Sequence, residues 1–358
     1  MGEKLDKPNM NKNSSDGKIK GFRFGMSQIQ GWKKTMEVFN IKEIELDKKN
    51  HITIFGLFDG HSGKEVSQYL SSNFASQLSK NINFINGDYK QALIETFEKI
   101  DISLRTPEVN NKLALYSKQN KLLQMQNITD IYKTIDNSNN LNKNDIEDLN
   151  TFMDILDPNN LEGVFISDYI GSSGIIILIS EKITYVANAG NSHCIAINKN
   201  FSLIKEKTII EQNLYNKSEK NRIKIAKGIM YGKEREKNFD KEELLYTRGF
   251  GDFQYKSNRI VNMENQEIIC KPDIFEISND DVKFLIICNS GFFESARILC
   301  NNIKNNKIIE KYLANFFIEK LKNKQKIISD IIGDYFNEVM PKRIDTNLSC
   351  IIVDFLGN

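Results

Sequence analysis

Residues that mark specialised classes of protein are scarce in this sequence. Only five cysteines occur among 358 residues, far apart and without a C-x-x-C pair. This spacing argues against zinc ribbons and dithiol redox motifs, so we expect reduced thiols, mostly in a core. No apolar run approaches the ~18 residues of a membrane span, and the polar N-terminal residues lack the apolar segment of a secretory signal. We therefore expect a cytoplasmic protein with no membrane span.

An excess of charge of either sign is also missing. Lys and Arg number 49 against 47 Asp and Glu, which gives a net charge of +2. This balance gives no electrostatic reason to expect a nucleic acid or an anionic membrane as partner. Hydrophobic residues make up 40% of the chain, which is enough for one large domain or two ordinary ones with a sizeable core.

Most of the chain alternates between predicted strands and helices. Residues 1–20 are polar without apolar periodicity, so we expect a disordered tail there. Short β-branched runs bounded by turn residues predict buried strands at 52–58, 174–179, 183–187, 195–197, 282–288 and 348–355. Apolar spacing of three to four predicts helices at 64–74, 89–104 and 311–339. The Asn- and Lys-rich segments 106–160 and 205–242 interrupt this pattern and are interpreted as insertions.

One segment stands out chemically, at the end of the first strand and directly before a helix. It reads Phe58-Asp59-Gly60-His61-Ser62-Gly63. A carboxylate, two glycines and an imidazole at a strand end can hold a cation while the backbone approaches it closely. Taken alone, the same residues are equally typical of a turn that caps the following helix.

Further segments, in the same order along the chain, extend this motif into a resemblance. With residues 58–63, the segments 25–37, 171–174, 186–193, 247–252, 271–274, 287–294 and 346–353 resemble the motifs of the protein phosphatase 2C family of metal-dependent Ser/Thr phosphatases. The resemblance spans residues 21–355. It implies an α+β fold, a four-layer α-β-β-α sandwich of two antiparallel sheets flanked by helices. It also implies two Mg²⁺ or Mn²⁺ ions and a bridging water that attacks a phosphoserine or phosphothreonine.

Part of the family's catalytic set is retained. By the resemblance, Asp59 with the Gly60 carbonyl matches the bridging metal ligand, Glu37 an outer carboxylate and His61 the general acid. Lys33 stands where the family has a phosphate-binding arginine, so a charge remains but the bidentate fork is lost.

Other family carboxylates are replaced. Val38, Ser290, Thr346 and Asn191 stand where the resemblance places aspartates. Two doubly charged cations ~4 Å apart repel by roughly 17 kcal/mol at an effective dielectric constant of 20, and negative ligands must offset that repulsion. We therefore expect either no bound ion or a single weakly bound one. Two features could compensate in part: a strand bulge could turn Asp345 inward, and Glu294 replaces a family aspartate conservatively.

These observations favour a pseudophosphatase, a phosphatase-like domain that binds a partner protein, with a phosphoprotein as one candidate partner. A weakly active Ser/Thr phosphatase and a structural subunit of a larger assembly remain as alternatives. Outside the motif matches, Trp32 is interpreted as a core residue on a strand, His193 and His51 as surface or strand-end residues, and Asp252 as a cap or turn former.

Overall fold

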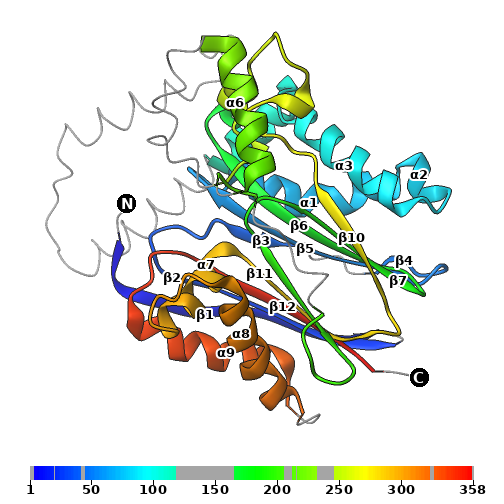
Figure 1. Ribbon diagram of the computed structural model, residues 1–358, viewed down its shortest axis with the longest axis vertical. Helices are drawn as coiled ribbons and strands as arrows, with labels where there is room; N and C mark the ends of the chain where they lie inside the picture. Colours follow the sequence, from blue (N-terminus) through cyan, green and yellow to red (C-terminus); the bar gives the residue numbers. More distant parts are fainter. Residues whose placement is uncertain are drawn as a thin grey trace, which may run out of the picture.

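The computed structural model describes residues 4–19, 21–41, 45–117, 165–204, 212–214, 216–231, 246–322 and 326–356, with only the backbone for 226–231. Within these ranges the strands form two antiparallel sheets packed face to face, with helices on both outer faces (Figure 1). The expected four-layer sandwich is therefore confirmed.

The first sheet has five strands in the order β1-β2-β12-β11-β8 among the described residues. Its strands are β1 (Lys4–Ile19), β2 (Phe22–Lys33), β8 (His193–Asn198), β11 (Val282–Cys288) and β12 (Leu348–Phe355). On its outer face lie α7 (Ser290–Leu299), α8 (Asn306–Leu321) and α9 (Ile328–Val339), which share one buried apolar cluster with the sheet. The helix expected at 311–339 is thus two helices, α8 and α9.

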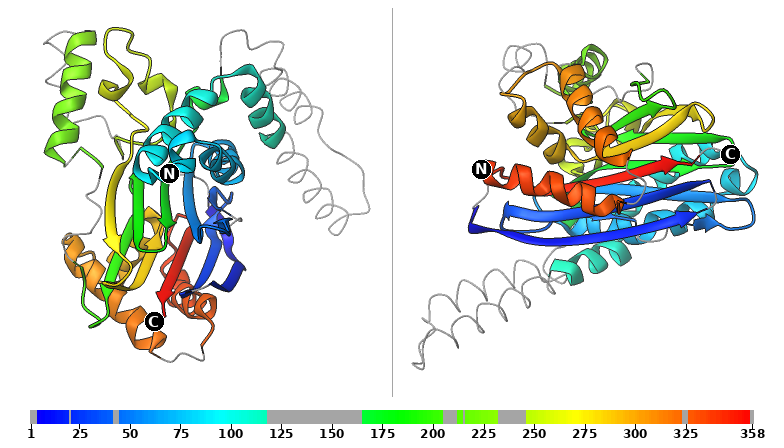
Figure 2. Two further views of the ribbon diagram at one scale, coloured as in Figure 1. Left: turned by 90° about the vertical axis from the view of Figure 1, so that its right-hand side faces the viewer. Right: turned by 90° about the horizontal axis from the view of Figure 1, so that it is seen from below.

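The second sheet follows the order β10-β7-β6-β5-β3 in the described part of the chain, and β4 and β9 pair at its side. Its strands are β3 (Val38–Asn40), β4 (Glu45–Asp47), β5 (Ile52–His61), β6 (Gly171–Ile179), β7 (Ile183–Ala189), β9 (Phe250–Gly251) and β10 (Asp273–Ser278). Its outer face carries α1 (Glu65–Ser79) and α3 (Tyr89–Ser103), with the short α2 (Ile82–Ile85) beside α3 (Figure 2).

Alternating side chains explain why the central strands read as continuous apolar runs. On β12, Ile351 and Val353 pack in the core between the sheets, whereas Cys350 and Ile352 pack under the helices. Both faces of the strand are buried, so no polar residue is needed on either side. The same holds for β5, where Phe55 and Leu57 face the other sheet and Ile54 and Phe58 face α1 and α3.

The expectation of a disordered tail is wrong for residues 4–19. They form β1, which pairs with β2 from Lys12 opposite Ile29 to Ile19 opposite Phe22. Its side chains are mostly exposed, and the strand is held by main-chain pairing and by contacts such as Lys12 Nζ to Gly333 O at 3.2 Å. Lysines and Pro8 are typical of an edge strand, and such a strand carries no apolar period in its sequence.

The two Asn- and Lys-rich segments are described only in part. Residues 107–117 are helical, with Val109 and Leu113 buried, and α6 (Lys217–Tyr231) lies in the second segment. Residues 118–164, 205–211 and 232–245 lie outside the described residues. No described helix combines the length and apolarity needed to cross a bilayer. All five cysteines are described and unpaired, and four of them are buried.

Candidate functional site

The C-terminal end of β5 lies at the edge of the core between the two sheets. Phe55, Leu57 and Asp59 follow one another along one face of β5, and the first two belong to the core between the sheets. Val38 on β3 and Ser173 on β6 lie directly opposite Asp59 in the two neighbouring strands. Asp59 therefore continues the inward-facing row of β5 at the edge of the apolar core.

Neutral groups from the other sheet contact the Asp59 carboxylate. Asn289, which follows β11 and caps α7, donates from Nδ2 to Asp59 Oδ2 at 3.1 Å. Ser290, the first residue of α7, donates from Oγ to the same oxygen at 3.1 Å. Burial raises the pKa of Asp59 above its ordinary value, although these hydrogen bonds and the charge of Lys33 act in the opposite direction.

Glu37 is held within the protein from several directions. Its carboxylate is 7% exposed and accepts hydrogen bonds from Lys33 Nζ and from Thr35 Oγ1, the latter at 2.6 Å. Its backbone N–H donates to Asn347 Oδ1 at 2.9 Å, which ties the segment to the start of β12. Both carboxylate oxygens of Glu37 thus have a donor within the protein.

Gly60 is required by close packing. Its N–H donates to Glu37 O at 3.0 Å. A Cβ at this position would lie 2.7 Å from Ser67 Oγ and 2.9 Å from Glu37 O, so a larger residue would push α1 or the Glu37 segment away.

His61 belongs to a group that the sequence did not reveal. Its Nε2 lies 2.6 Å from Asp252 Oδ2 and also contacts the hydroxyl of Tyr246, which donates to the same Asp252 oxygen at 2.9 Å. Burial, followed by the nearby charge of Asp252, raises the pKa of Tyr246 far above its ordinary range. The phenol therefore stays protonated and acts as a donor.

Asp252 was interpreted as a cap or turn former, and this describes only its backbone. The residue has φ of 52° and begins a short 3-10 helix, but its side chain makes no capping hydrogen bond. The carboxylate instead contacts His61, because β9 pairs with β6 at Gly171 and Gly171 pairs with His61 on β5. The contact between His61 and Asp252 can therefore be identified only once the pairing of β5, β6 and β9 is known.

The four replaced positions differ in their surroundings. Thr346 packs against the start of α7, since a Cβ on Gly291, the residue after Ser290, would lie 2.3 Å from Thr346 Oγ1. Val38 is fully buried in the core between the sheets. Asn191 is partly buried in the bend between β7 and β8.

The two possible compensating acids are engaged elsewhere. Asp345 precedes β12 and lies 3.8 Å from Lys4 Nζ, and no bulge turns it into the sheet. Glu294 is half exposed on α7 and pairs with Arg297 at 2.9 Å. Neither carboxylate contacts Asp59.

Three further interpretations can be compared with the structure. Trp32 is a core residue on β2 and donates from Nε1 to Met340 O at 2.9 Å, as expected. His193 is the first residue of β8, so the strand-end alternative is confirmed and the surface alternative is wrong, because the side chain is buried. Its ring stacks on Phe293, and burial lowers its pKa to about 3. His51 is exposed in the turn before β5.

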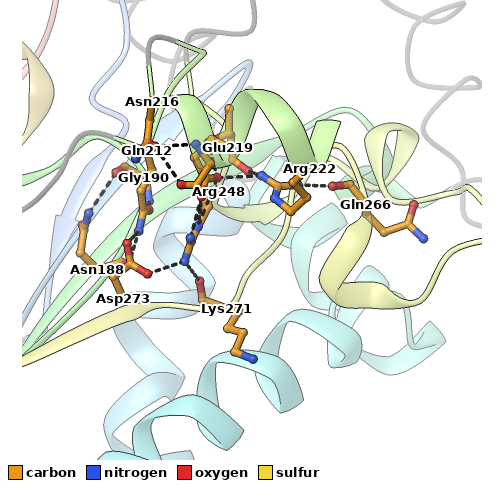
Figure 3. Close-up of polar contacts among 12 residues, drawn as sticks. Asn188, Gly190, Gln212, Asn216, Glu219, Arg222, Arg248, Gln266, Lys271 and Asp273 are labelled. Carbon is orange, nitrogen blue, oxygen red and sulfur yellow. Dashed lines mark hydrogen bonds and ion pairs between the residues drawn. The ribbon is translucent and has the colours of Figure 1, made fainter. Parts of the chain in front are cut away.

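A second polar cluster, the Glu219 network, lies beside this site and joins α6 to the second sheet (Figure 3). Glu219 is 2% exposed and accepts hydrogen bonds from Arg248 Nη2 at 2.6 Å, Arg222 Nη2 at 2.8 Å and Thr247 Oγ1 at 2.7 Å. Arg248 also donates from Nη1 to Asp273 Oδ1 at 2.8 Å. Burial would raise the pKa of Glu219, but the two guanidinium groups outweigh it and lower the pKa to about 2.

The candidate metal ligands can be tested as a set. Within the part of the chain that the structure describes, no three or more His, Cys, Asp or Glu side chains converge in a manner that could hold a metal ion. Of the acids around this strand end, Asp59 faces amide and hydroxyl donors, Glu37 faces Lys33, and Asp252 faces His61. These groups can bind and orient polar ligands.

Comparison with known proteins relates the whole arrangement to a family. The sequence profile described as "Protein phosphatase 2C" matches residues 22–118 and 115–297. Probable protein phosphatase 2C 4 of Paramecium tetraurelia is 28% identical over 350 residues, covering 98% of this chain and 94% of that protein. Probable protein phosphatase 2C 21 of Arabidopsis thaliana is 28% identical over 333 residues, covering 91% and 84%.

The fold agrees with this relationship. The crystal structure of a phosphatase from Toxoplasma gondii superposes with a TM-score of 0.60 at 16% identity and covers 96% of both chains. At this identity the likeness concerns the fold alone. The family profile, by contrast, matches well over half of the sequence, and the chain belongs to the protein phosphatase 2C family.

Proposed function

We propose that this protein is a pseudophosphatase, a phosphatase 2C domain that binds a partner protein and does not assemble a binuclear metal centre. The observation that carries the proposal is the set of neighbours of Asp59. Asn289, Ser290 and Val38 surround it, and none of them carries a negative charge.

The polar residues around Asp59 are called the cleft below: Lys33, Glu37, His61, Asp252, Asn289 and Ser290. Their donor chemistry argues against two ions. Mg²⁺ and Mn²⁺ select carboxylate, carbonyl and water oxygens, and a pair of such ions needs several anionic ligands to offset their mutual repulsion. Ser290 and Thr346 offer neutral hydroxyls, and Val38 offers no ligand atom. The residues therefore fit at most one ion, held by Asp59 and the Gly60 carbonyl with several waters.

Internal pairing weakens the cleft further as a cation site. A cation at Glu37 must compete with the ammonium of Lys33, and a cation at Asp252 must compete with His61 and Tyr246. The raised pKa of Asp59 also favours its protonated form relative to an ordinary aspartate. A metal ion could bind Glu37 or Asp252 only if these side chains gave up their contacts with Lys33, His61 and Tyr246.

The alternative, a weakly active Mg²⁺- or Mn²⁺-dependent protein serine/threonine phosphatase, has one observation in its favour. Three carboxylates, those of Glu37, Asp59 and Asp252, remain around one strand end, with a single ammonium and one histidine. This leaves residual negative charge for one cation. Lys33 would then contact a phosphate as a point charge.

Metal binding and turnover separate the two functions. The purified full-length chain is titrated with Mn²⁺ by calorimetry, and release of phosphate from a phosphothreonine peptide is followed with millimolar Mn²⁺ or Mg²⁺. Asp59→Asn tests the cleft, and Asp280→Asn, an exposed aspartate in the turn after β10, is the matched control. We expect no binuclear binding and no turnover above background in any of the three proteins.

The decisive contrary result is turnover that disappears in Asp59→Asn and persists in Asp280→Asn. That pattern would establish the phosphatase. As a complementary experiment, Ser290→Asp combined with Thr346→Asp introduces carboxylates at two of the replaced positions, Ser290 beside Asp59 and Thr346 against the start of α7. We expect this double variant to bind Mn²⁺ more tightly than the wild type.

A further inference from the structure

Two adjoining grooves lie outside the cleft, between α3 and the segment that follows β9. The first, of about 380 Å³, is lined by Glu98, Ile102, Asn262, Met263, Glu264, Ile269, Cys270 and Lys271. The second, of about 450 Å³, is lined by Arg105, Lys256, Ser257, Asn258, Arg259, Val261, Asn262, Met263 and Gln266. Asn262 and Met263 line both grooves, so the grooves are neighbours, and neither includes a residue of the cleft. In Figure 1 the yellow segment after β9 lies beside α3.

The first groove, called the apolar groove below, exposes large hydrophobic side chains. Ile102 on α3 is 57% exposed and Met263 is 45% exposed, while Ile269 lies buried at its base. Ile260, nearby in the same segment, is 72% exposed. Burying such side chains is favourable by ~25 cal/mol per Å², and apolar patches with a polar rim are typical of protein interaction sites.

The charged residues of the apolar groove lie on its rim. Lys271 and Glu264 pair at 2.7 Å and are both partly exposed. Burial raises the pKa of Glu98, although Lys271 acts in the opposite direction. This rim gives the apolar groove no strong charge of its own.

The second groove, called the basic groove below, is lined by three cations and by no Asp or Glu. Lys256 is neutralised by Asp101 at 2.8 Å, and both side chains are buried. Arg105 lies over the rings of Phe165 and Phe253 and has Nε 3.3 Å from Asp168 Oδ1. Its two terminal nitrogens donate to no acceptor in the described part of the chain.

Arg259 completes the basic groove and is available to a ligand. Its side chain is exposed and makes no hydrogen bond or ion pair with the described residues. Arg105 is fixed by its stacking on two aromatic rings, so it loses little freedom when it binds an anion. The exposed guanidinium of Arg259, together with the terminal nitrogens of Arg105 beside its ion pair with Asp168, fits a carboxylate that follows an apolar side chain.

We propose that these grooves bind an extended, acidic segment of a partner protein. An apolar side chain of the segment enters the apolar groove, and one or more carboxylates pair with Arg105 and Arg259. A peptide fits better than a small molecule because two grooves share Asn262 and Met263 and expose the large apolar side chains of Ile102 and Met263. These grooves would be the place where the pseudophosphatase binds its partner, so the biological meaning of the docking surface rests on the proposed function. The binding itself requires no metal.

Fluorescence anisotropy with the full-length chain tests the docking surface. The probes are labelled peptides in which a leucine is followed by glutamates, in a small panel that varies the spacing between them. The variants are Arg259→Glu for the basic groove and Met263→Ser for the apolar groove. Lys199→Glu, an exposed lysine after β8, and Ile85→Ser, 65% exposed on α2, are the matched controls.

We expect saturable binding that Arg259→Glu weakens by about tenfold or more, whereas Lys199→Glu leaves it unchanged. Met263→Ser should weaken binding severalfold more than Ile85→Ser. A peptide with lysines in place of the glutamates should bind poorly to the wild type and better to Arg259→Glu. Addition of Mn²⁺ should change none of these affinities.

Three outcomes would overturn the proposal. The first is that no peptide of the panel binds saturably. The second is that Arg259→Glu and Lys199→Glu lose the same affinity for the glutamate peptide. The third is that the wild type binds the lysine peptide as tightly as the glutamate peptide. None of these readouts measures turnover. Discovery of phosphatase activity would therefore remove the pseudophosphatase assignment while leaving the docking result intact, and failed docking would leave the catalytic question open to its own assay.

Discussion

The two polar clusters at this end of the molecule treat their buried acids differently. In the Glu219 network, two guanidinium groups face one carboxylate, and Asp273, paired with Arg248, supplies the second negative charge. In the cleft, Asp59 receives its hydrogen bonds from an amide and a hydroxyl. The charges of the Glu219 network are therefore paired within the protein, whereas Asp59 has only neutral hydrogen-bond donors.

The pKa values follow this difference. Glu219 has a pKa lowered to about 2 by Arg248 and Arg222 in spite of its burial, whereas burial raises the pKa of Asp59. A buried carboxylate without a cationic partner is costly, and a metal ion is one way to supply the missing charge. In this chain Val38, Ser290 and Thr346, at positions where the family resemblance places further carboxylates, are neutral or apolar.

The largest expected effect comes from placing a carboxylate at Val38. Its side chain is fully buried in the core between the sheets, so Val38→Asp should lower the free energy of unfolding by roughly 4 kcal/mol, measured by urea denaturation. Val38→Thr, of similar shape, should cost considerably less. If millimolar Mn²⁺ restored the stability of Val38→Asp, the side chain would face an ion and the contrast between the two clusters would fail.

Removing the charge of Glu219 comes next. Glu219→Gln leaves two buried guanidinium groups with a neutral acceptor, so we expect a loss of about 3 kcal/mol in the free energy of unfolding. Glu276→Gln is the control, because its pair with Lys90 is exposed and should contribute less than ~1 kcal/mol. Similar small losses in both variants would mean that the Glu219 network does not stabilise the fold.

Acid titration distinguishes the wild type from Glu219→Gln. A carboxylate with a lowered native pKa stabilises the fold above its unfolded pKa, and this contribution is lost as the pH falls. For Glu219 the loss should run from about pH 4.5 towards the native value near 2. Glu219→Gln should lose less stability than the wild type across this interval, as followed by urea denaturation at each pH.

The sequence predicted the layers of the fold well where both faces of a strand are buried. The runs at 52–58, 282–288 and 348–355 became β5, β11 and β12, since their apolar residues serve the core between the sheets and the helices outside. It failed for β1, whose order comes from main-chain pairing with β2 and leaves most side chains in solvent. Main-chain hydrogen bonds do not depend on the type of side chain, so this pairing leaves no pattern in the sequence.

For the site, residues within one motif were easier to predict than contacts between motifs. Asp59, Gly60 and His61 follow one another on β5, and Glu37 and Lys33 lie close to them, as the ordered motifs implied. The contacts of His61 with Asp252 and Tyr246 depend on β9, β6 and β5 pairing in register, which no local pattern encodes. Tyr246 also lies outside every motif that the resemblance provided.

The smallest expected effect, and the sharpest for the comparison, concerns Asp59 itself. An acid with a raised native pKa is protonated in the folded state first, so its cost to the fold is largest at neutral pH and falls as the pH drops through that value. Asp59→Asn should therefore raise the free energy of unfolding at neutral pH, by less than ~1 kcal/mol, and this gain should vanish in acid. Urea denaturation at several pH values measures it, with Asp280→Asn as the control. The opposite result would be an Asp59→Asn variant that is less stable than the wild type at neutral pH, with a difference that grows when Mn²⁺ is added to both proteins. It would mean that the ionised carboxylate has a cationic partner after all.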